Sequence, residues 1–321
     1  MNTEKKAQNK LLLGLSPAQW AGLVLFIVPL VAYYGFLDIF HLGRNTIVSW
    51  LASVWKSSDD YGFGWMVYVL SAYMMGHAAV RSKDLPKKGS VHGMWLLLFS
   101  GFMLLASVRT LQPRLAQATL PFLCLGCVWY YWGRALAWRM VFPCCFTWLG
   151  IPLPSFQQAT VGLQLIATNA SHLLAGLAGV ETIVEGTNIS SATQQWDAFS
   201  VAGGCSGIRS LVALMMMSFA WAYLAEGLQW WKRAILALSA IPLAIVANVF
   251  RVTSIFVCAE YITPAFASKT WHDWSGLMFF FPASLLGLFA LHSLLAGEIL
   301  FFRKRKVVVR MAGNDNGKEE A

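Results

Sequence analysis

The chain has 321 residues, of which 57% are hydrophobic and only 12% are charged, and its mean hydropathy is +0.57. Soluble globular proteins carry about 25% charged residues, so this composition indicates a membrane protein. The formal net charge of +9 does not indicate a nucleic-acid-binding protein, because the basic residues form short clusters beside apolar runs. Apolar runs fill nearly the whole chain, which predicts a single membrane-embedded domain over 1–321.

Eight apolar runs approach the ~20 residues that a membrane-spanning helix needs. They cover residues 18–40, 61–80, 93–108, 117–133, 138–153, 205–225, 234–257 and 275–302. If all eight runs span, the basic clusters at 5–10, 81–88, 134–139, 232–233 and 303–306 share one side. The positive-inside rule assigns that side to the cytoplasm, although Arg109 and Arg114 then lie outside. The predicted fold is an all-α polytopic membrane protein of about eight transmembrane helices with both termini inside.

Five parts follow from this topology. They are a cytoplasmic N-terminus (1–17), five helices (18–153), an extracytoplasmic insertion (154–203), the catalytic helices (204–302) and a cytoplasmic tail (303–321) that is expected to be disordered. The first run lacks a small-residue cleavage site and is expected to remain as a helix. Within the insertion, apolar residues at helical spacing from Gln157 to Val180 predict an amphipathic or half-buried helix on the outer surface. The segment 187–204 is polar, with the apolar residues Trp196, Phe199 and Val201 alternating with polar ones. This pattern predicts a short hairpin leading to Cys205.

Cys205 differs from the other five cysteines of the chain. Most of those lie inside apolar runs, where free cysteine packs as a small hydrophobic residue. Cys205 follows Gly203 and Gly204 at the start of an apolar run, and a thiol in the first turn of a helix is favoured as the thiolate by the helix dipole. Cys205 is therefore the candidate nucleophile. The alternative is that the small residues from 203 to 207 serve close helix packing.

Two other polar residues are predicted at the same membrane face as Cys205. Arg251 lies late in the outward-running seventh run, where an arginine costs about 2.5–3.5 kcal/mol, and snorkelling to headgroups is its alternative role. His272 is placed in the outer loop before the eighth run, and its unperturbed pKa of ~6.5 suits both proton acceptance and donation. Its alternative is an aromatic belt with Trp271 and Trp274. Cysteine, arginine and histidine together indicate acyl transfer.

Three neighbours are expected to support this chemistry. Arg209 lies one turn after Cys205 and is expected to bind the substrate backbone or to stabilise the bundle. Asn248 lies one turn before Arg251 and is expected to orient it, to donate to an oxyanion, or simply to bond a neighbouring helix. Ser206 adjoins the thiol. The remaining histidines show no metal-ligand spacing, so neither a metal nor a cofactor is expected.

The order and spacing of these residues resemble the exosortase/archaeosortase family of membrane transpeptidases over roughly residues 120–300. The segments that carry the resemblance are Phe142-Pro143, Gly150-Ile151-Pro152-Leu153-Pro154, Ala202 to Ser210, Asn248 to Val252 and His272 to Gly276. The resemblance implies a Cys-Arg-His active site, here Cys205, Arg251 and His272. The archaeal branch has arginine where this chain has His272, so the resemblance is to the bacterial exosortases.

The resemblance also implies a function. The family is thought to cleave C-terminal sorting signals of the PEP-CTERM type, made of a short motif, a transmembrane helix and a basic end, through an acyl-enzyme thioester. The released protein would pass to a cell-envelope acceptor, and the sequence does not separate this transfer from hydrolysis. The expected partners are such membrane-anchored substrates, the lipid bilayer and an unidentified acceptor nucleophile, without nucleic acid. The expected location is the bacterial inner membrane, with the active site on the extracytoplasmic face.

Two other classes of function remain open. One is a polytopic transporter or channel in which Arg251 and Arg209 bind an anion, although the sequence shows no duplicated halves. The other is a non-catalytic factor for envelope or polysaccharide export, in which the cysteine is incidental.

Overall fold

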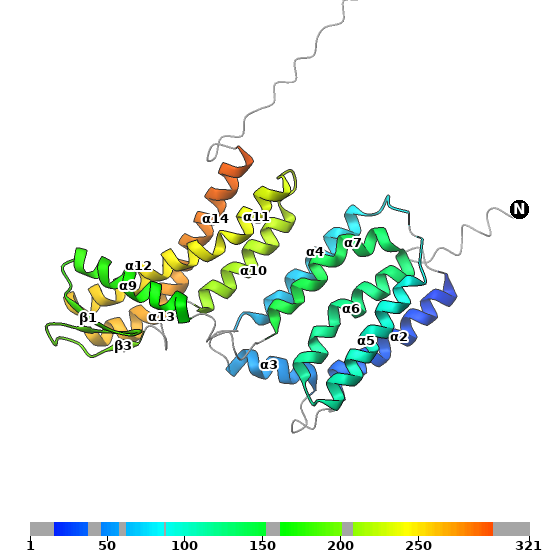
Figure 1. Ribbon diagram of the computed structural model, residues 1–321, viewed down its shortest axis with the longest axis horizontal. Helices are drawn as coiled ribbons and strands as arrows, with labels where there is room; N and C mark the ends of the chain where they lie inside the picture. Colours follow the sequence, from blue (N-terminus) through cyan, green and yellow to red (C-terminus); the bar gives the residue numbers. More distant parts are fainter. Residues whose placement is uncertain are drawn as a thin grey trace, which may run out of the picture.

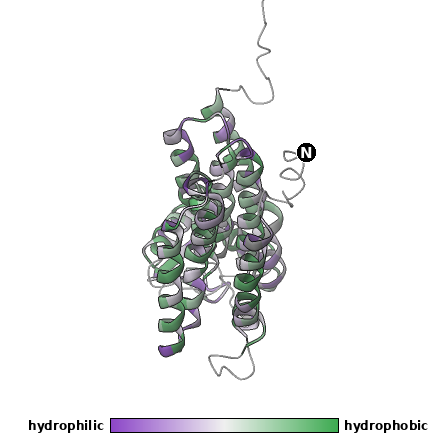
Figure 2. Ribbon diagram, turned by 90° about the vertical axis from the view of Figure 1, so that its right-hand side faces the viewer, coloured by the Kyte–Doolittle hydropathy of each residue, from purple (hydrophilic) through white to green (hydrophobic). Residues whose placement is uncertain are grey.

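The structure, a computed structural model, describes residues 16–37, 46–57, 62–86, 88–151, 161–200 and 208–297. These residues are mostly helical, and a small three-stranded sheet accompanies the helices (Figure 1). An N-terminal and a C-terminal group of helices meet where α4 contacts α10. Hydrophobic residues predominate along the helices in the turned view of Figure 2. The helical class predicted from the sequence is confirmed.

The N-terminal group matches the first five predicted runs. Its helices are α2 (Pro17–Gly35), α4 (Gly64–Arg81), α5 (His92–Arg109), α6 (Pro113–Trp132) and α7 (Arg134–Phe146), and α7 continues into the 3₁₀ turn η2 (Thr147–Gly150). A capping box between Ser16 and Gln19 starts α2, which satisfies backbone N–H groups that the first turn leaves unpaired. Gly133, at φ 96°, separates α6 from α7 in a conformation that favours glycine.

Helix α3 (Ile47–Ser57) was not predicted. It lies in the connection between the first two predicted spans and runs across the bundle in Figure 1. Ile47 and Leu51 are buried, and the Trp55 indole N–H donates to the carbonyl oxygen of Gly150 at 3.1 Å. Only one face of this short helix is apolar, so its stability comes from these tertiary contacts.

The C-terminal group consists of α10 (Ile208–Leu224), α11 (Trp230–Leu238), α12 (Ala240–Tyr261) and α14 (Phe281–Ala296). The sequence prediction is wrong about the segment that precedes α14. His272 was expected in a loop, whereas the π-helix η3 (Phe266–Trp271), the short α13 (His272–Ser275) and the π-helix η4 (Gly276–Phe280) lead without a break into α14. Hydrogen bonds of Arg251 and Ser254 on α12 with His272 and Trp271 stabilise the helical conformation of this segment.

The insertion forms the predicted helix and hairpin. Helix α9 (Val161–Leu177) is followed by the antiparallel strands β1 (Thr182–Glu185), β2 (Asn188–Ser191) and β3 (Phe199–Ser200), in the order β1-β2-β3. The prediction started the hairpin at residue 187, but its first strand lies before that residue. The turn between β1 and β2 is at Gly186, whose φ is 64°. Ile189 pairs with both Val184 and Phe199.

Among the described residues, three helices are long and apolar enough to cross a membrane. They are His92–Arg109, Trp230–Tyr261 and Phe266–Ala296, and shorter apolar helices cover Gln19–Gly35, Val161–Leu177 and Ser210–Leu224. The second of these spans joins α11 to α12, and the third includes η3, α13, η4 and α14. The number of eight spans and the predicted orientation stay predictions.

Candidate functional site

Arg251 lies in the middle of α12 and reaches the helical segment that contains His272. Its Nη2 group donates to the main-chain carbonyl oxygen of His272 at 2.9 Å, in a part-buried position. Hydrogen bonds from a charged donor are stronger than neutral ones. This bond brings together two of the three residues that the sequence assigned to the active site.

Gly276 provides room for the arginine. A Cβ atom at this position would lie 3.0 Å from Cζ of Arg251 and 3.1 Å from its Nε. That separation is shorter than an ordinary van der Waals contact between such atoms. The guanidinium therefore packs directly against the backbone of η4, and any side chain at position 276 would displace it.

Ser254 makes a second connection between the same two segments. Its hydroxyl donates to the carbonyl oxygen of Arg251 at 2.6 Å and accepts the indole N–H of Trp271 at 2.8 Å. Two residues of η3 and α13, Trp271 and His272, are thus bonded to one turn of α12. Sequence reasoning missed Ser254, and only its spacing of three residues from Arg251 could have indicated a shared helix face.

His272 is paired with its neighbour in sequence. Its Nδ1 atom lies 3.0 Å from Oδ1 of Asp273, and the histidine side chain is 25% exposed while that of Asp273 is 74% exposed. When Nδ1 carries the proton and donates to this carboxylate, Nε2 is the basic nitrogen. Asp273, the next residue in the sequence, is thus within hydrogen-bond range of the imidazole.

The other predicted residues are only partly described. Asn248 is 5% exposed and lies one turn before Arg251 on α12. Cys205 and Ser206 lie outside the described residues. Arg209 is the second residue of α10, and its side chain also lies outside what the structure describes. The contact of Cys205 with Arg251 or His272 therefore stays a prediction.

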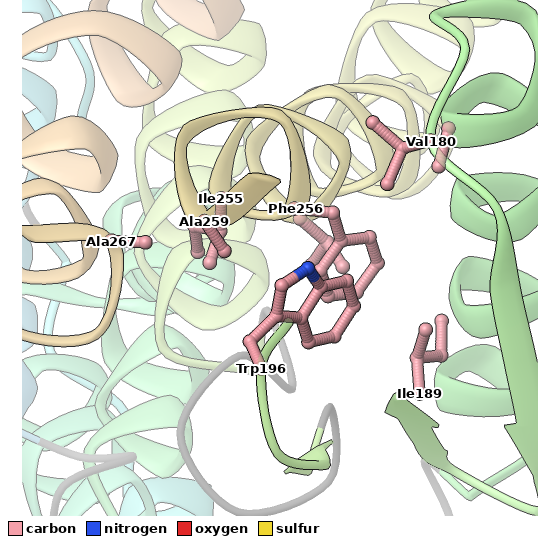
Figure 3. Close-up of a cluster of buried hydrophobic side chains, with 9 residues drawn as sticks. Val180, Ile189, Trp196, Ile255, Phe256, Ala259 and Ala267 are labelled. Atoms are coloured by element: carbon pink, nitrogen blue, oxygen red, sulfur yellow. The ribbon is translucent and has the colours of Figure 1, made fainter. Parts of the chain in front are cut away.

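The insertion is attached to the same helix, beyond Arg251. The Trp196 ring stacks on Phe256 with centroids 5.4 Å apart, within a buried cluster that includes Val180, Ile189 and Ala267 (Figure 3). The Trp196 N–H donates to Glu260 Oε2 at 2.8 Å. The sheet is therefore fixed to the last turns of α12, and the chain leaves it at Ser200, five residues before Cys205.

Glu260 collects further bonds from the insertion and was also missed by sequence reasoning. The hydroxyls of Ser191 and Thr193 donate to its carboxylate at 3.5 Å and 3.3 Å. A carboxylate at the end of an apolar helix is a signal that could have found it, because such a group needs several donors. Within the described residues, no group of three or more His, Cys, Asp or Glu side chains could hold a metal ion.

Apolar helices of membrane-spanning length among the described residues define a helical membrane protein, and the candidate site lies where α12 contacts α13 and η4. The family model described as transmembrane exosortase matches residues 55–290. This match covers most of the chain, so the chain belongs to the transmembrane exosortase family. The matched region begins well before residue 120, so the N-terminal helices α4 to α7 belong to the family pattern as well. No curated protein and no solved structure gave a significant match.

Proposed function

We propose that this chain is a cysteine transpeptidase that cleaves C-terminal sorting signals of membrane-anchored proteins at the outer face of the bacterial inner membrane. The substrates would carry PEP-CTERM-type signals, and the released protein would be transferred to an acceptor of the cell envelope. The observation that carries the proposal is the hydrogen bond from Arg251 to the His272 carbonyl. It joins two residues that the family resemblance assigns to one active site although 21 positions separate them in the chain.

The proposed first step is attack on the scissile peptide. His272 Nε2 accepts the proton of the Cys205 thiol, and the thiolate attacks the carbonyl carbon of the substrate. The oxygen gains negative charge, which we assign to the guanidinium of Arg251 to stabilise. Collapse of this intermediate breaks the carbon–nitrogen bond, and the leaving amine takes the proton from His272. The products are a thioester on Cys205 and the released C-terminal segment.

The second step regenerates the enzyme. An acceptor amine or water attacks the thioester carbon, His272 accepts its proton, and the carbon–sulfur bond breaks to restore the Cys205 thiolate. Asp273 supports both steps, because a carboxylate at Nδ1 stabilises the protonated imidazole and fixes its orientation.

Replacing Cys205 with alanine tests the proposal. A suitable reporter is a soluble domain followed by a PEP-CTERM-type sorting signal, which consists of a short motif, an apolar helix of about 20 residues and a basic end. The reporter and the enzyme are reconstituted together in vesicles. Loss of cleavage in Cys205→Ala, together with a hydroxylamine-sensitive thioester in the parent chain, is the expected result. Equal cleavage by both proteins would show that Cys205 is not the nucleophile.

A further inference from the structure

An apolar groove of about 450 Å³ lies between α12 and the segment where η4 meets α14. On α12 it extends from Leu243 to Ser254, and on the other side from Phe280 to Ser284. Near its inner limit the two helices are in close contact, since a Cβ at Gly287 would lie 2.9 Å from Leu243 Cδ2. None of the eight lining residues that the structure describes is charged.

The outer limit of the groove is the candidate site itself. Ser254, which lines the groove, is the residue that bonds the Arg251 carbonyl and the Trp271 ring. Phe250 also lines it, immediately before Arg251, and is 54% exposed. A molecule lying in the groove would therefore have one end beside the polar residues of the site.

The dimensions and the side chains suit a helix. Eleven residue steps from Leu243 to Ser254 correspond to about 17 Å along α12, roughly half of the ~30 Å hydrocarbon thickness. Four lining residues are small, namely Ala247, Ser254, Ala283 and Ser284. Small side chains let a second helix approach closely in the bilayer, where packing rather than hydrophobicity drives association.

We propose that this groove is the docking site for the transmembrane helix of the substrate, and that docking sets which peptide bond reaches Arg251 and His272. The inference rests on the proposed function. It is carried by the continuity of the groove with the site, because an apolar helix in the groove would continue directly into the segment to be cleaved. On this proposal, Phe250, Ala283 and the other lining residues determine which substrate helix binds, although they do not take part in the chemistry.

Photo-cross-linking in the Cys205→Ala protein tests docking without requiring cleavage. The probe is the reporter described above, with a photoreactive amino acid at successive positions of its apolar helix. Cross-links are expected in peptides from α12 and α14. Filling the groove by Ala283→Leu is expected to lower their yield about tenfold, because the larger side chain occupies space that the docked helix needs. The matched control is Ala296→Leu, an exposed position of the same helix outside the groove, which should leave the yield unchanged.

Two results would overturn the inference. One is cross-linking to other helices; the other is a yield that Ala283→Leu does not alter. If native mass spectrometry then shows a lipid that only Ala283→Leu displaces, the groove is a lipid site. Failure of the proposed function has a different sign, namely reporter cleavage that survives in vesicles with Cys205→Ala. The cross-linking pattern would still show whether the reporter helix binds in the groove.

Discussion

The guanidinium of Arg251 donates to the main-chain carbonyl of His272 at 2.9 Å, so the position of the arginine is tied to the backbone on which the histidine is carried. This hydrogen bond does not involve the imidazole, because its acceptor is the main-chain oxygen of His272. A substitution of His272 would therefore leave the Arg251 bond in place, which allows the two residues to be tested independently.

Replacing Arg251 with lysine is expected to lower reporter processing by about 10²-fold, the usual loss for one donor to an oxyanion. Lysine keeps the charge but lacks the planar fork that reaches both His272 and a substrate oxygen. The rate of cleavage in vesicles measures the effect. Arg233→Lys is the control, because Arg233 also donates to a backbone carbonyl, that of Leu228 at 3.0 Å, away from the site. Equal cleavage rates for both variants would show that Arg251 does not stabilise the oxyanion.

The substitution Gly276→Ala is expected to slow processing roughly 10- to 100-fold, because small misplacements of catalytic groups have effects of this size. The new methyl group would lie 3.0 Å from Arg251 Cζ and push the guanidinium aside. Gly101→Ala in α5 is the matched control, since a Cβ there meets nothing within 4 Å. The control should keep full activity and gain up to about 1 kcal/mol in helix stability. Full activity of Gly276→Ala would refute the packing argument.

The bond between Ser254 and Trp271 should be measurable by a double-mutant cycle. Ser254→Ala removes the acceptor for the indole N–H, and a buried donor without a partner costs about 1–3 kcal/mol. Trp271→Phe removes that donor, so adding Ser254→Ala to Trp271→Phe should cost less than in the parent chain, by at least about 0.5 kcal/mol. Thermal unfolding in detergent micelles measures the four proteins. Strictly additive changes in stability would mean that the bond contributes nothing.

Removing Glu260 should loosen the insertion. In Glu260→Ala, Trp196, Ser191 and Thr193 lose their common acceptor, so backbone amides of β2 should exchange with deuterium at least about tenfold faster, equivalent to about 1.4 kcal/mol. Glu260→Gln, which keeps an acceptor oxygen, should restore part of the protection. The control is Glu181→Ala, at an exposed side chain. Unchanged exchange in Glu260→Ala would show that the stack of Trp196 on Phe256 suffices.

The orientation predicted from the basic clusters can be tested with single cysteines added at exposed positions. Gln195→Cys in the insertion should react with a membrane-impermeant maleimide in intact cells, whereas Gln229→Cys, before α11, should react only in inverted vesicles. Both positions are exposed, and labelling is compared with that of the parent chain. The reverse labelling pattern would show that the predicted orientation is wrong and that the proposed site faces the cytoplasm.

The sequence by itself determined the membrane class, the helical fold and the family, because apolar runs, charge clusters and short motifs are local properties of a chain. It also indicated the helix and hairpin of the insertion. The cost of a charged residue near an apolar span and the surrounding motifs made Arg251 and His272 candidate site residues. These signals need no knowledge of which helices are neighbours.

Tertiary structure alone decided the conformation around His272 and the contacts of Arg251. The place of His272 between two apolar runs favoured a loop, but the bonds from α12 to His272 and Trp271 keep the segment helical. The partners of Ser254 and Glu260 were decided by the tertiary structure as well, since Trp271 and Trp196 lie 17 and 64 positions away in the chain. The groove beside the site depends on how α12 and α14 pack, because its two walls come from separate helices and no local pattern records their spacing.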